Sequence, residues 1–406
     1  MIRVISLTLM FFCVFKLSFV EGQSSPIQVF TKREKGIELI QKDSLFSLQF
    51  QFRMQNRAGY LSNSLDDLTP EQFEFRVRRL RMRFKGFVID PRINYYIQLS
   101  FSRGDMDWDD TQASTINNSP NVVRDAVISY QVSPKFQLSF GQTKLPGNRQ
   151  RVISSGNLQF ADRSIVNATF NIDRDFGFFA NYSTNYFNLK GALTSGEGRN
   201  SSKSTKGLNY TGRLEVLPFG KFSPGNDECE GDLARESKPK VALAATYNFN
   251  DDALRTGGTL GNDLYAPVDL RNIQLDAVFK YKGFSFYQEY LSRSASQSIT
   301  VNDQGKTRNV YVGFGVLSQC SYNFKNNVEL ALRLATVTPN KAVYDDALFP
   351  AVNEKRQEQW QFGITKYLYG HRLKVQGNLL YHLTKDLKSS TKKSQVGAIF
   401  QVELGI

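Results

Sequence analysis

The sequence lacks the long apolar runs and the cysteine and histidine clusters that define several protein classes. Beyond the first 22 residues, no segment approaches the ~18 to 20 uninterrupted apolar residues that a transmembrane helix needs. The 406 residues include only three cysteines and two histidines. These shortages exclude a helical membrane protein and a disulfide-rich scaffold. Zinc-ligand spacing, a phosphate-cradling glycine loop and a calcium-binding loop are also missing, so we expect no cofactor and no metal.

The scarcity of histidine also argues against an enzyme. A lipase built on a barrel would need a histidine partnered with a serine near the rim. His382 falls on the polar side of a predicted strand, and no serine or cysteine nucleophile can be tied to it. Of the cysteines, Cys13 lies in the N-terminal apolar run, while Cys229 and Cys320 could form one disulfide in an oxidising compartment. We therefore expect a protein that is not an enzyme.

The N-terminal 22 residues have the pattern of a secretory signal peptide. Arg3 precedes an apolar run over residues 5–15, and small residues follow near a suitable cleavage site. Lys16 interrupts the run and keeps it too short to span a bilayer. We expect cleavage after residue 22 and a polar, irregular lead-in on the periplasmic side over residues 23–43.

The charge balance indicates an anionic partner. Lys and Arg number 51 against 38 Asp and Glu, which gives a net charge of +13. Such a balance favours nucleic acid, acidic lipid or small anions. Because an exported protein does not meet nucleic acid, we expect lipid and small anions as partners and no nucleic acid.

The most informative stretch is FEFRVRRLRMRF, residues 73–84. From residue 79 onward, apolar and basic residues alternate one for one. This is the period of a β-strand with one apolar and one cationic face. In a soluble sheet these faces would meet the core and the solvent. In a membrane barrel the apolar face meets lipid and the arginines point into a water-filled pore.

The same alternation recurs along the whole chain. We count about sixteen alternating segments, and a mean hydropathy of −0.37 is compatible with strands that each average to near neutrality. Long and short connections alternate between them, and the strand that ends the chain can seal against the first. The long connections are expected at residues 59–71, 103–121, 144–173, 196–206, 251–269, 294–307, 338–356 and 384–393. Only residues 218–239 break the rhythm, because they form a long connection on the side of the short turns.

This rhythm predicts an all-β protein, a transmembrane antiparallel β-barrel of about 16 strands. It occupies residues 44–406 as a single outer-membrane domain, with short periplasmic turns and long outer loops. A soluble exported β-sheet is the alternative, but it would not be expected to keep the rhythm through so many hairpins.

The strand over residues 73–84 contains a change of phase. Phe73, Phe75 and Val77 are out of step with the apolar residues that follow Arg79. Arg78 and Arg79 can both face the lumen only if the strand has a β-bulge there, which we predict. Alternatively, the strand ends or bends at the rim and these arginines bind lipopolysaccharide phosphates.

Residues 125–182 resemble a known family. Its most specific matches are GQTKLP at residues 141–146, LQFADRS at 158–164 and DRDFG at 173–177. With the arginine-rich stretch that begins at residue 76, this part of the chain is similar to the phosphate-selective porin O and P family of Gram-negative outer membranes, in the form common among Bacteroidetes. The second half is similar only in general character, and the terminal Ile406 departs from the aromatic residue that ends most barrels.

The resemblance implies an outer-membrane porin. It implies a homotrimer of 16-stranded barrels in contact with lipid and lipopolysaccharide, with the third outer loop, residues 144–173, folded into the lumen as a constriction. It further implies a water-filled, anion-preferring channel for passive diffusion of small anions such as phosphate or other oxyanions. A porin-like barrel that serves as a structural or accessory part of a secretion or nutrient-uptake assembly is the alternative.

The resemblance also implies which residues bind the anion. A ladder of arginines on the barrel wall faces a basic residue and a serine pair on the loop. The matching residues are Arg78, Arg79, Arg81 and Arg83 on the wall, and Arg151, Ser154 and Ser155 on the loop. Arg151 stands where the family often has lysine, which bears on selectivity for phosphate.

Four further basic residues are candidates for the pore lining. Lys144, Arg149 and Arg163 could line the loop, although Asp162 or Asp173 could pair with any of them. Arg333 lies between two leucines on a predicted strand and should face the lumen. A wall arginine paired with a carboxylate is the alternative reading for it.

Overall fold

The computed structural model describes residues 27–32, 36–41, 45–102, 122–201, 205–345 and 355–406. The predicted signal peptide, residues 1–22, and the predicted connection 103–121 lie outside the described residues. Among the described residues, no helix is both long and apolar enough to cross a membrane.

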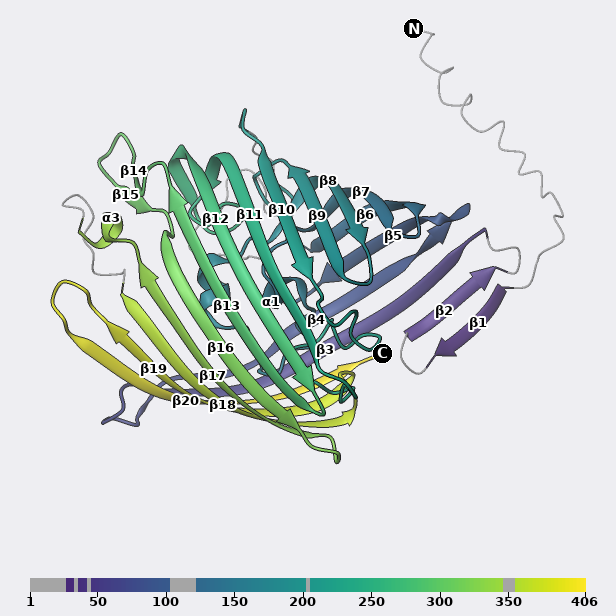
Figure 1. Cartoon of the computed structure of the whole chain (residues 1–406). Helices are drawn as coiled ribbons and strands as arrows, with labels where there is room; N and C mark the ends of the chain where they lie inside the picture. Colours follow the sequence, from purple (N-terminus) through teal and green to yellow (C-terminus); the bar gives the residue numbers. More distant parts are fainter. Residues whose placement is uncertain (1–26, 33–35, 42–44, 103–121, 202–204, 346–354) are drawn as a thin grey trace, which may run out of the picture.

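The chain forms a closed antiparallel barrel of 16 strands, as predicted (Figure 1). Consecutive barrel strands pair with one another, and β20 (Lys392–Gly405) pairs with β3 (Ser47–Ser62) to close the ring. The closure leaves no open edge between the first and last strands. The other barrel strands are β4 (Pro70–Val88), β5 (Asp90–Ser100), β6 (Val123–Ser133), β7 (Phe136–Lys144), β8 (Arg174–Ser183), β9 (Phe187–Thr194), β10 (Asn209–Val216), β11 (Lys240–Arg255), β12 (Asp263–Tyr281), β13 (Phe284–Ala295), β16 (Gly313–Asn323), β17 (Val328–Pro339), β18 (Arg356–Tyr369) and β19 (Leu373–Lys385).

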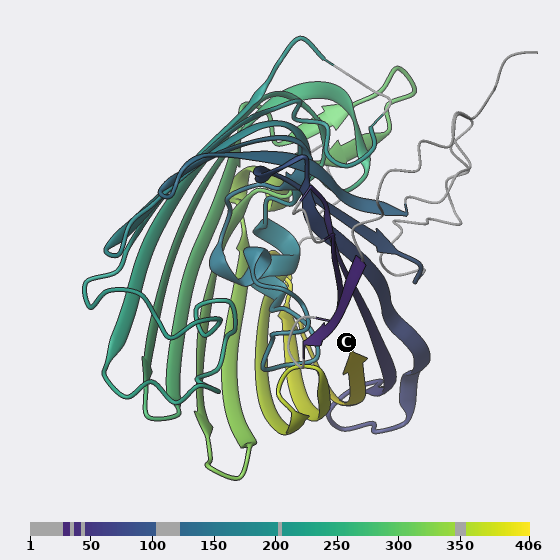
Figure 2. The ribbon, with the colours of Figure 1, turned by 90° about the vertical axis from the view of Figure 1, so that its right-hand side faces the viewer.

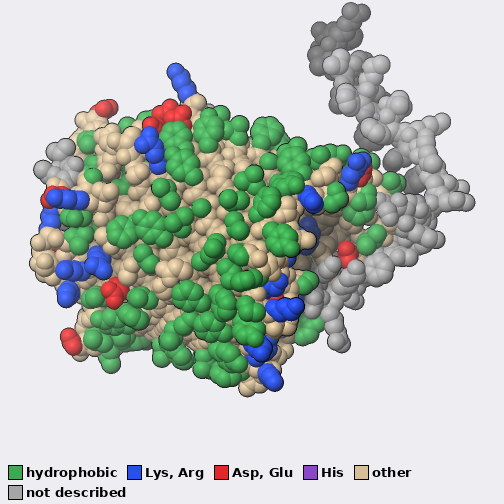
Figure 3. All heavy atoms as spheres, in the orientation of Figure 1, with side chains coloured by type: hydrophobic (Ala, Val, Ile, Leu, Met, Phe, Trp, Pro, Cys, Tyr) green, Lys and Arg blue, Asp and Glu red, His purple; other side chains and the backbone are tan. Residues whose placement is uncertain are grey.

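The two faces of the barrel wall are inverted relative to a soluble protein. On β17, the side chain of Leu332 is 58% exposed, whereas its neighbour Arg333 is 2% exposed. The same alternation of exposed apolar and buried polar residues runs along most strands, and Figure 3 shows apolar side chains spread over the outer face of the strands. An apolar exterior around a polar interior is the arrangement of a barrel in lipid.

Strand β4 contains the predicted bulge. Gln55 of β3 pairs with Arg79, and the next residue, Asn56, pairs with Val77, so Arg78 is the extra residue. Phe75 on the outer side of the bulge is 79% exposed, while Arg78 and Arg79 both reach the same inward carboxylate. The bulge is therefore confirmed, and the alternative in which the strand ends at these arginines is wrong.

The lead-in is partly ordered, which differs from our expectation of an irregular segment. Strands β1 (Ile27–Lys32) and β2 (Gly36–Gln41) form a hairpin. Residues 37–40 of β2 pair with residues 47–50 of β3, whereas β20 pairs with β3 only from Arg53 onward. The hairpin thus covers backbone groups of β3 that the end of the chain does not reach, which explains why a polar segment forms strands.

Two expected outer connections are shorter than predicted. Strands β3 and β4 extend into the predicted connection 59–71, and β11 and β12 extend into 251–269. These stretches are polar and therefore lack the alternating pattern of a lipid-facing strand. Their backbones nevertheless continue the hydrogen-bonded pairing of the strands beyond the part of the wall whose outer side chains must be apolar. Within the predicted connection 294–307, β14 (Ile299–Val301) begins a small separate hairpin with β15 (Thr307–Asn309).

Two connections contact the inner face of the wall. We call residues 145–173 the lumen loop and residues 217–239 the turn-side loop. The lumen loop carries the short helices α1 (Arg149–Val152) and α2 (Ile165–Phe170), which lie within the ring of strands in Figure 2. A third short helix, α3 (Lys341–Tyr344), lies in the connection between β17 and β18.

An apolar cluster packs both loops against the wall. Val166 and Phe170 of the lumen loop share it with Phe222 of the turn-side loop and with Tyr287 and Leu317 of β13 and β16. Because inward-facing side chains form this cluster, it lies inside the barrel and on one side of it.

The two cysteines among the described residues are not bonded to each other. Cys229 is buried in the turn-side loop. Cys320 lies on β16 between Gln319 and Ser321, which face inward, so its thiol is on the outer face. The disulfide that the cysteine count allowed is therefore absent.

The lipid-facing position of Leu332 generates a test of the fold. We expect Leu332→Arg to lower the free energy of unfolding in lipid bilayers by about 2–4 kcal/mol, because a cation on the lipid face loses its hydration. Leu68→Arg is the matched control, since Leu68 is 60% exposed in the connection between β3 and β4. Denaturant unfolding in vesicles should show a change within ~0.5 kcal/mol for the control. Equal effects of the two substitutions would contradict the assignment of the outer face.

Candidate functional site

A cavity of about 850 Å³ lies inside the barrel, between the lumen loop and the wall. Its lining holds thirteen basic side chains and five acidic ones. The acidic residues are Asp162, Asp173, Glu215, Asp227 and Glu228. The basic residues are Arg78, Arg79, Arg81, Arg83, Arg124, Lys144, Arg149, Arg151, Arg163, Arg174, Lys190, Arg199 and Arg213. This excess of positive charge makes the cavity attractive to anions.

Three wall arginines converge on the serine pair of the lumen loop. Arg53 donates to the hydroxyl of Ser154 at 3.1 Å and to that of Ser155 at 2.7 Å. Arg83 donates to Ser154 at 2.8 Å, and Arg81 donates to Ser155 at 3.2 Å. Ser154 lines the cavity, whereas Ser155 is buried behind it. The structure thus brings the predicted serine pair and part of the predicted ladder together.

Asp162 of the lumen loop sits among three other wall arginines. Its carboxylate is 2.5 Å from Arg57 and 3.2 Å from both Arg78 and Arg79. Burial alone would raise the pKa of this carboxyl group, but the three guanidinium groups outweigh burial and hold the pKa well below its usual range. The carboxylate is therefore ionised at neutral pH and compensates part of the charge of the predicted ladder.

A second carboxylate holds the predicted loop arginine. Arg151 forms an ion pair with Asp173, which also lies 3.1 Å from Arg174 and 4.0 Å from Arg199. Burial would raise the pKa of Asp173, but Arg151 and the neighbouring arginines lower it well below the usual value. Arg151 thus lines the cavity as predicted, while its charge is shared with a buried carboxylate.

Lys144 and Arg163 hold the backbone of the lumen loop. The Lys144 ammonium donates to the carbonyl oxygen of Val152 at 2.6 Å. Arg163 donates to the carbonyl oxygens of Gln150 and Ile153, both at 2.7 Å. Both basic residues line the cavity, but these hydrogen bonds fix the lumen loop rather than leave the donors for a solute. Arg149 also lines the cavity, but its guanidinium group forms ion pairs with Glu215 and Asp276 on the wall. These ion pairs hold the lumen loop to the wall.

Arg333 differs from the expectation. It faces inward, but it does not line the cavity, because the two loops cover it. Its guanidinium group donates to Gln319 at 2.7 Å, lies over the ring of Phe160 at 4.1 Å, and is 3.8 Å from the carboxylate of Glu230. The alternative reading, a wall arginine paired with a carboxylate, describes this residue.

Sequence reasoning missed several basic residues of the site. Arg53 alternates with the apolar residues of the first predicted strand, so the inward phase of that strand could have identified it. The same phase argument applies to Arg124, Arg174 and Arg213, which lie on inward positions of β6, β8 and β10. Arg199 lies in a connection without periodicity, and no sequence signal pointed to it.

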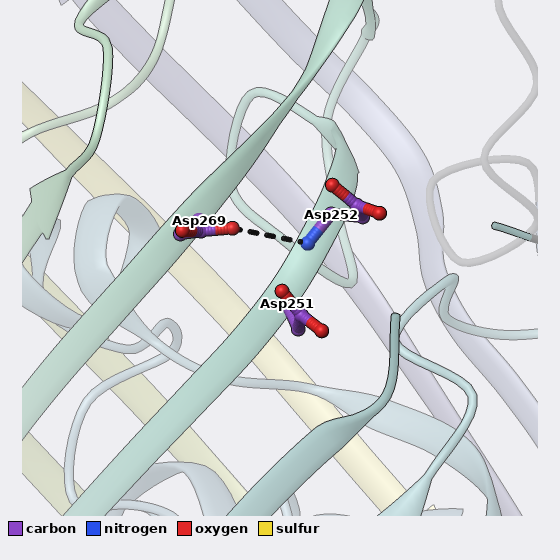
Figure 4. A group of neighbouring side chains, drawn as sticks. All are labelled: Asp251, Asp252 and Asp269. Atoms are coloured by element: carbon purple, nitrogen blue, oxygen red, sulfur yellow. Dashed lines mark hydrogen bonds between the residues drawn. The ribbon is translucent and has the colours of Figure 1, made fainter. Parts of the chain in front are cut away.

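One group of carboxylates outside the barrel lumen resembles a cation site. Ligand oxygens of Asp251 and Asp252 on β11 and of Asp269 on β12 lie within 4.8 Å of one another (Figure 4). The backbone N–H of Asp252 donates to Asp269 at 3.4 Å. Exposed acidic groups of this kind are common without an ion, so we assign no metal to them.

The closed barrel, its apolar exterior and its polar lumen define an outer-membrane channel protein. A family model, phosphate-selective porin O and P, matches residues 48–402, and the chain belongs to this family. No curated protein matches the chain. The family and the fold are typical of channels that are not enzymes.

Solved porins share the fold. An anion-selective porin from Comamonas acidovorans has a TM-score of 0.54 at 11% identity, and the match covers 89% of this chain and 100% of that one. The channel DcaP of Acinetobacter baumannii also has a TM-score of 0.54, at 10% identity, and the match covers 89% of this chain and 97% of that one. The trimer form of OmpT from Vibrio cholerae has a TM-score of 0.52, at 10% identity, and the match covers 89% of this chain and 99% of that one. At these identities the matches show the architecture alone.

The position of Asp162 generates a test of the cavity's electrostatics. We expect Asp162→Asn to raise the anion preference of the channel, because the substitution leaves Arg57, Arg78 and Arg79 without their shared carboxylate. In planar bilayers under a KCl gradient, the reversal potential should move toward the chloride equilibrium potential.

Asp345→Asn is the matched control for this substitution. Asp345 makes an ion pair with Lys341 beside α3, and its side chain is 58% exposed. The control removes the same charge without altering the cavity lining, so its reversal potential should equal that of the wild type. A shift of Asp162→Asn toward the potassium potential would contradict the assignment.

Proposed function

We propose that this porin forms a water-filled channel that prefers small anions such as phosphate and lets them diffuse passively. The excess of basic over acidic side chains around the cavity carries the proposal. Guanidinium groups stay charged, offer forked donors to oxyanions and are less strongly hydrated than ammonium groups. They can therefore replace part of an anion's hydration shell, which passage through a narrow channel requires.

The arrangement around Ser154 suggests how binding stays weak enough for release. Arg53 and Arg83 donate to its hydroxyl oxygen, so the hydroxyl hydrogen is free to turn toward a solute. A hydroxyl adds a donor without adding charge. The carboxylate of Asp162 forms ion pairs with Arg78 and Arg79 and competes with a passing anion for these two guanidinium groups. Each anion thus meets several moderate partners in succession, which favours conduction over retention.

The lumen loop narrows the channel in this proposal. Hydrogen bonds from the wall hold it at two places, since Thr365 donates to the carbonyl oxygen of Gln159 at 3.2 Å and Lys374 donates to that of Leu158 at 2.8 Å. We further propose a homotrimer in contact with lipid and lipopolysaccharide, exported through a cleaved signal peptide. The trimer form of the OmpT structure supports the trimer by analogy of fold.

A second function is favoured by the filling of the lumen. Two loops occupy one side of the barrel, as expected if the barrel served as a structural or accessory part of a secretion or nutrient-uptake assembly. Bilayer recording of the purified protein separates the two functions. A conductance with anion preference supports the porin, whereas no conductance together with co-purifying partners supports the assembly component.

Block of the chloride current by phosphate tests the proposed site. We expect Arg83→Gln to weaken the block by roughly tenfold or more, because a hydrogen bond from a charged group contributes about 1.5–3 kcal/mol and 1.4 kcal/mol corresponds to a factor of ten. The measurement is the phosphate concentration that halves the chloride current, compared with the value for sulfate and for larger organic anions.

Arg92→Gln serves as the control for this experiment. Arg92 pairs with Asp90 at the start of β5, and its side chain is 59% exposed outside the cavity. Its replacement should leave the block unchanged. If Arg83→Gln behaves like the control, the residues around Ser154 do not bind phosphate.

A further inference from the structure

The turn-side loop is long for the end of the barrel on which it lies. Other connections at that end are short, since β6 and β7 are joined across residues 134–135, and β12 and β13 across 282–283. Residues 217–239 instead enter the lumen, where the side chains of Asn226, Cys229 and Glu230 are at most 5% exposed. A connection that needed only to join two strands would not bury polar residues in this way.

The wall holds this loop mainly through its backbone. Lys280 of β12 is 1% exposed, and its ammonium group donates to three carbonyl oxygens of the loop. These are the carbonyls of Asn226 at 2.5 Å, Cys229 at 2.9 Å and Gly231 at 2.8 Å. Asp232 then accepts a hydrogen bond from the backbone N–H of Gly283 at 2.7 Å. A buried ammonium with three acceptors fixes the loop firmly, because each bond to a charged group is strong in a dry interior.

Glu230 joins the turn-side loop to the lumen loop. Its carboxylate accepts from the side chain of Gln150 at 2.8 Å and from the backbone N–H of Gln159 at 2.9 Å. The backbone N–H of Glu230 donates in turn to the carbonyl of Asn157 at 3.1 Å. The same carboxylate also accepts from the wall residue Gln319 at 3.2 Å. Loss of this carboxylate would leave the buried side-chain amide of Gln150 and the backbone N–H of Gln159 without this acceptor, and would remove one of the two acceptors of the wall residue Gln319.

We propose that the turn-side loop is an inner plug that holds the lumen loop in place from the periplasmic side. Glu230 is the positioning residue of this contact, and Lys280 fastens the plug to the wall. The plug and the lumen loop together fill one side of the barrel and confine solutes to the arginine-lined side. Confinement of anions in particular rests on the proposed function, whereas the packing of the plug does not.

Cys229 supplies a readout of the plug that is independent of conduction. In a Cys320→Ser background it is the single thiol among the described residues, and it is buried. We expect Glu230→Ala and Lys280→Met to speed its reaction with a membrane-impermeant maleimide at least tenfold over the background. Lys238→Met is the matched control, because Lys238 is an exposed residue of the turn-side loop and does not line the cavity. The control should label as slowly as the background.

Single-channel recording of the same proteins tests the effect on the path. Loosening the lumen loop should raise the conductance of Glu230→Ala and increase its open-channel fluctuations. The reversal potential of the wild type, measured alongside, reports the proposed function separately. A wild type without anion preference would overturn that function and leave the plug to be judged by labelling.

The proposal fails if Cys229 reacts equally slowly in the background, Glu230→Ala and Lys280→Met. It also fails if Cys229 already reacts at the rate of an exposed thiol in the background. If Glu230→Ala does not yield a folded barrel, Glu230→Gln replaces it, since the amide retains the volume but offers fewer acceptors. Faster labelling of folded Glu230→Gln supports the plug, and unchanged labelling overturns the role of Glu230.

Discussion

A barrel in hydrocarbon must satisfy every backbone hydrogen bond within its own wall, since lipid offers no partner. The pairing of β20 with β3 meets this constraint by closing the ring. Closure in turn fixes which side chains face lipid and which face the lumen, because the side chains of a strand alternate. The basic residues of β3 and β4 are thereby directed into a space that water, solutes or other protein segments must fill.

In this protein, segments of the chain fill one side of that space. Charged groups in a confined interior need partners, and the carboxylates of Asp162 and Glu230 provide them from the two loops. Asp162 faces the open cavity and leaves room around its arginines, whereas Glu230 is fully enclosed. Ion pairs between arginine and carboxylate therefore moderate the positive charge of the cavity at Asp162 and hold the loops to the wall at Glu230.

The sequence predicted the barrel, the number of strands and the bulge, because these depend on periodicity, which is local. The phase slip at Arg78 was visible in the order of residues alone. Partners within the lumen depend on how distant segments meet, and periodicity carries no information about that. Arg333 shows the difference, since its inward direction was predictable but its covering by two loops was not. The hairpin of β1 and β2 was missed for a related reason. It forms because β2 pairs with backbone groups at the start of β3 that β20 does not reach, and the sequence of the hairpin alone does not show this.

The bulge in β4 adds one residue to the strand and shifts the alternation of inward and outward side chains by one position. Phe73, Phe75 and Val77 face outward before it, and Leu80, Met82 and Phe84 face outward after it, with two inward arginines between. Removing one of these two arginines would restore a strict alternation and keep all six apolar residues toward lipid. Removing a residue outside the bulge would turn part of the strand over. Within this strand, the bulge is therefore the place where the chain can lose a residue without moving charge into the membrane.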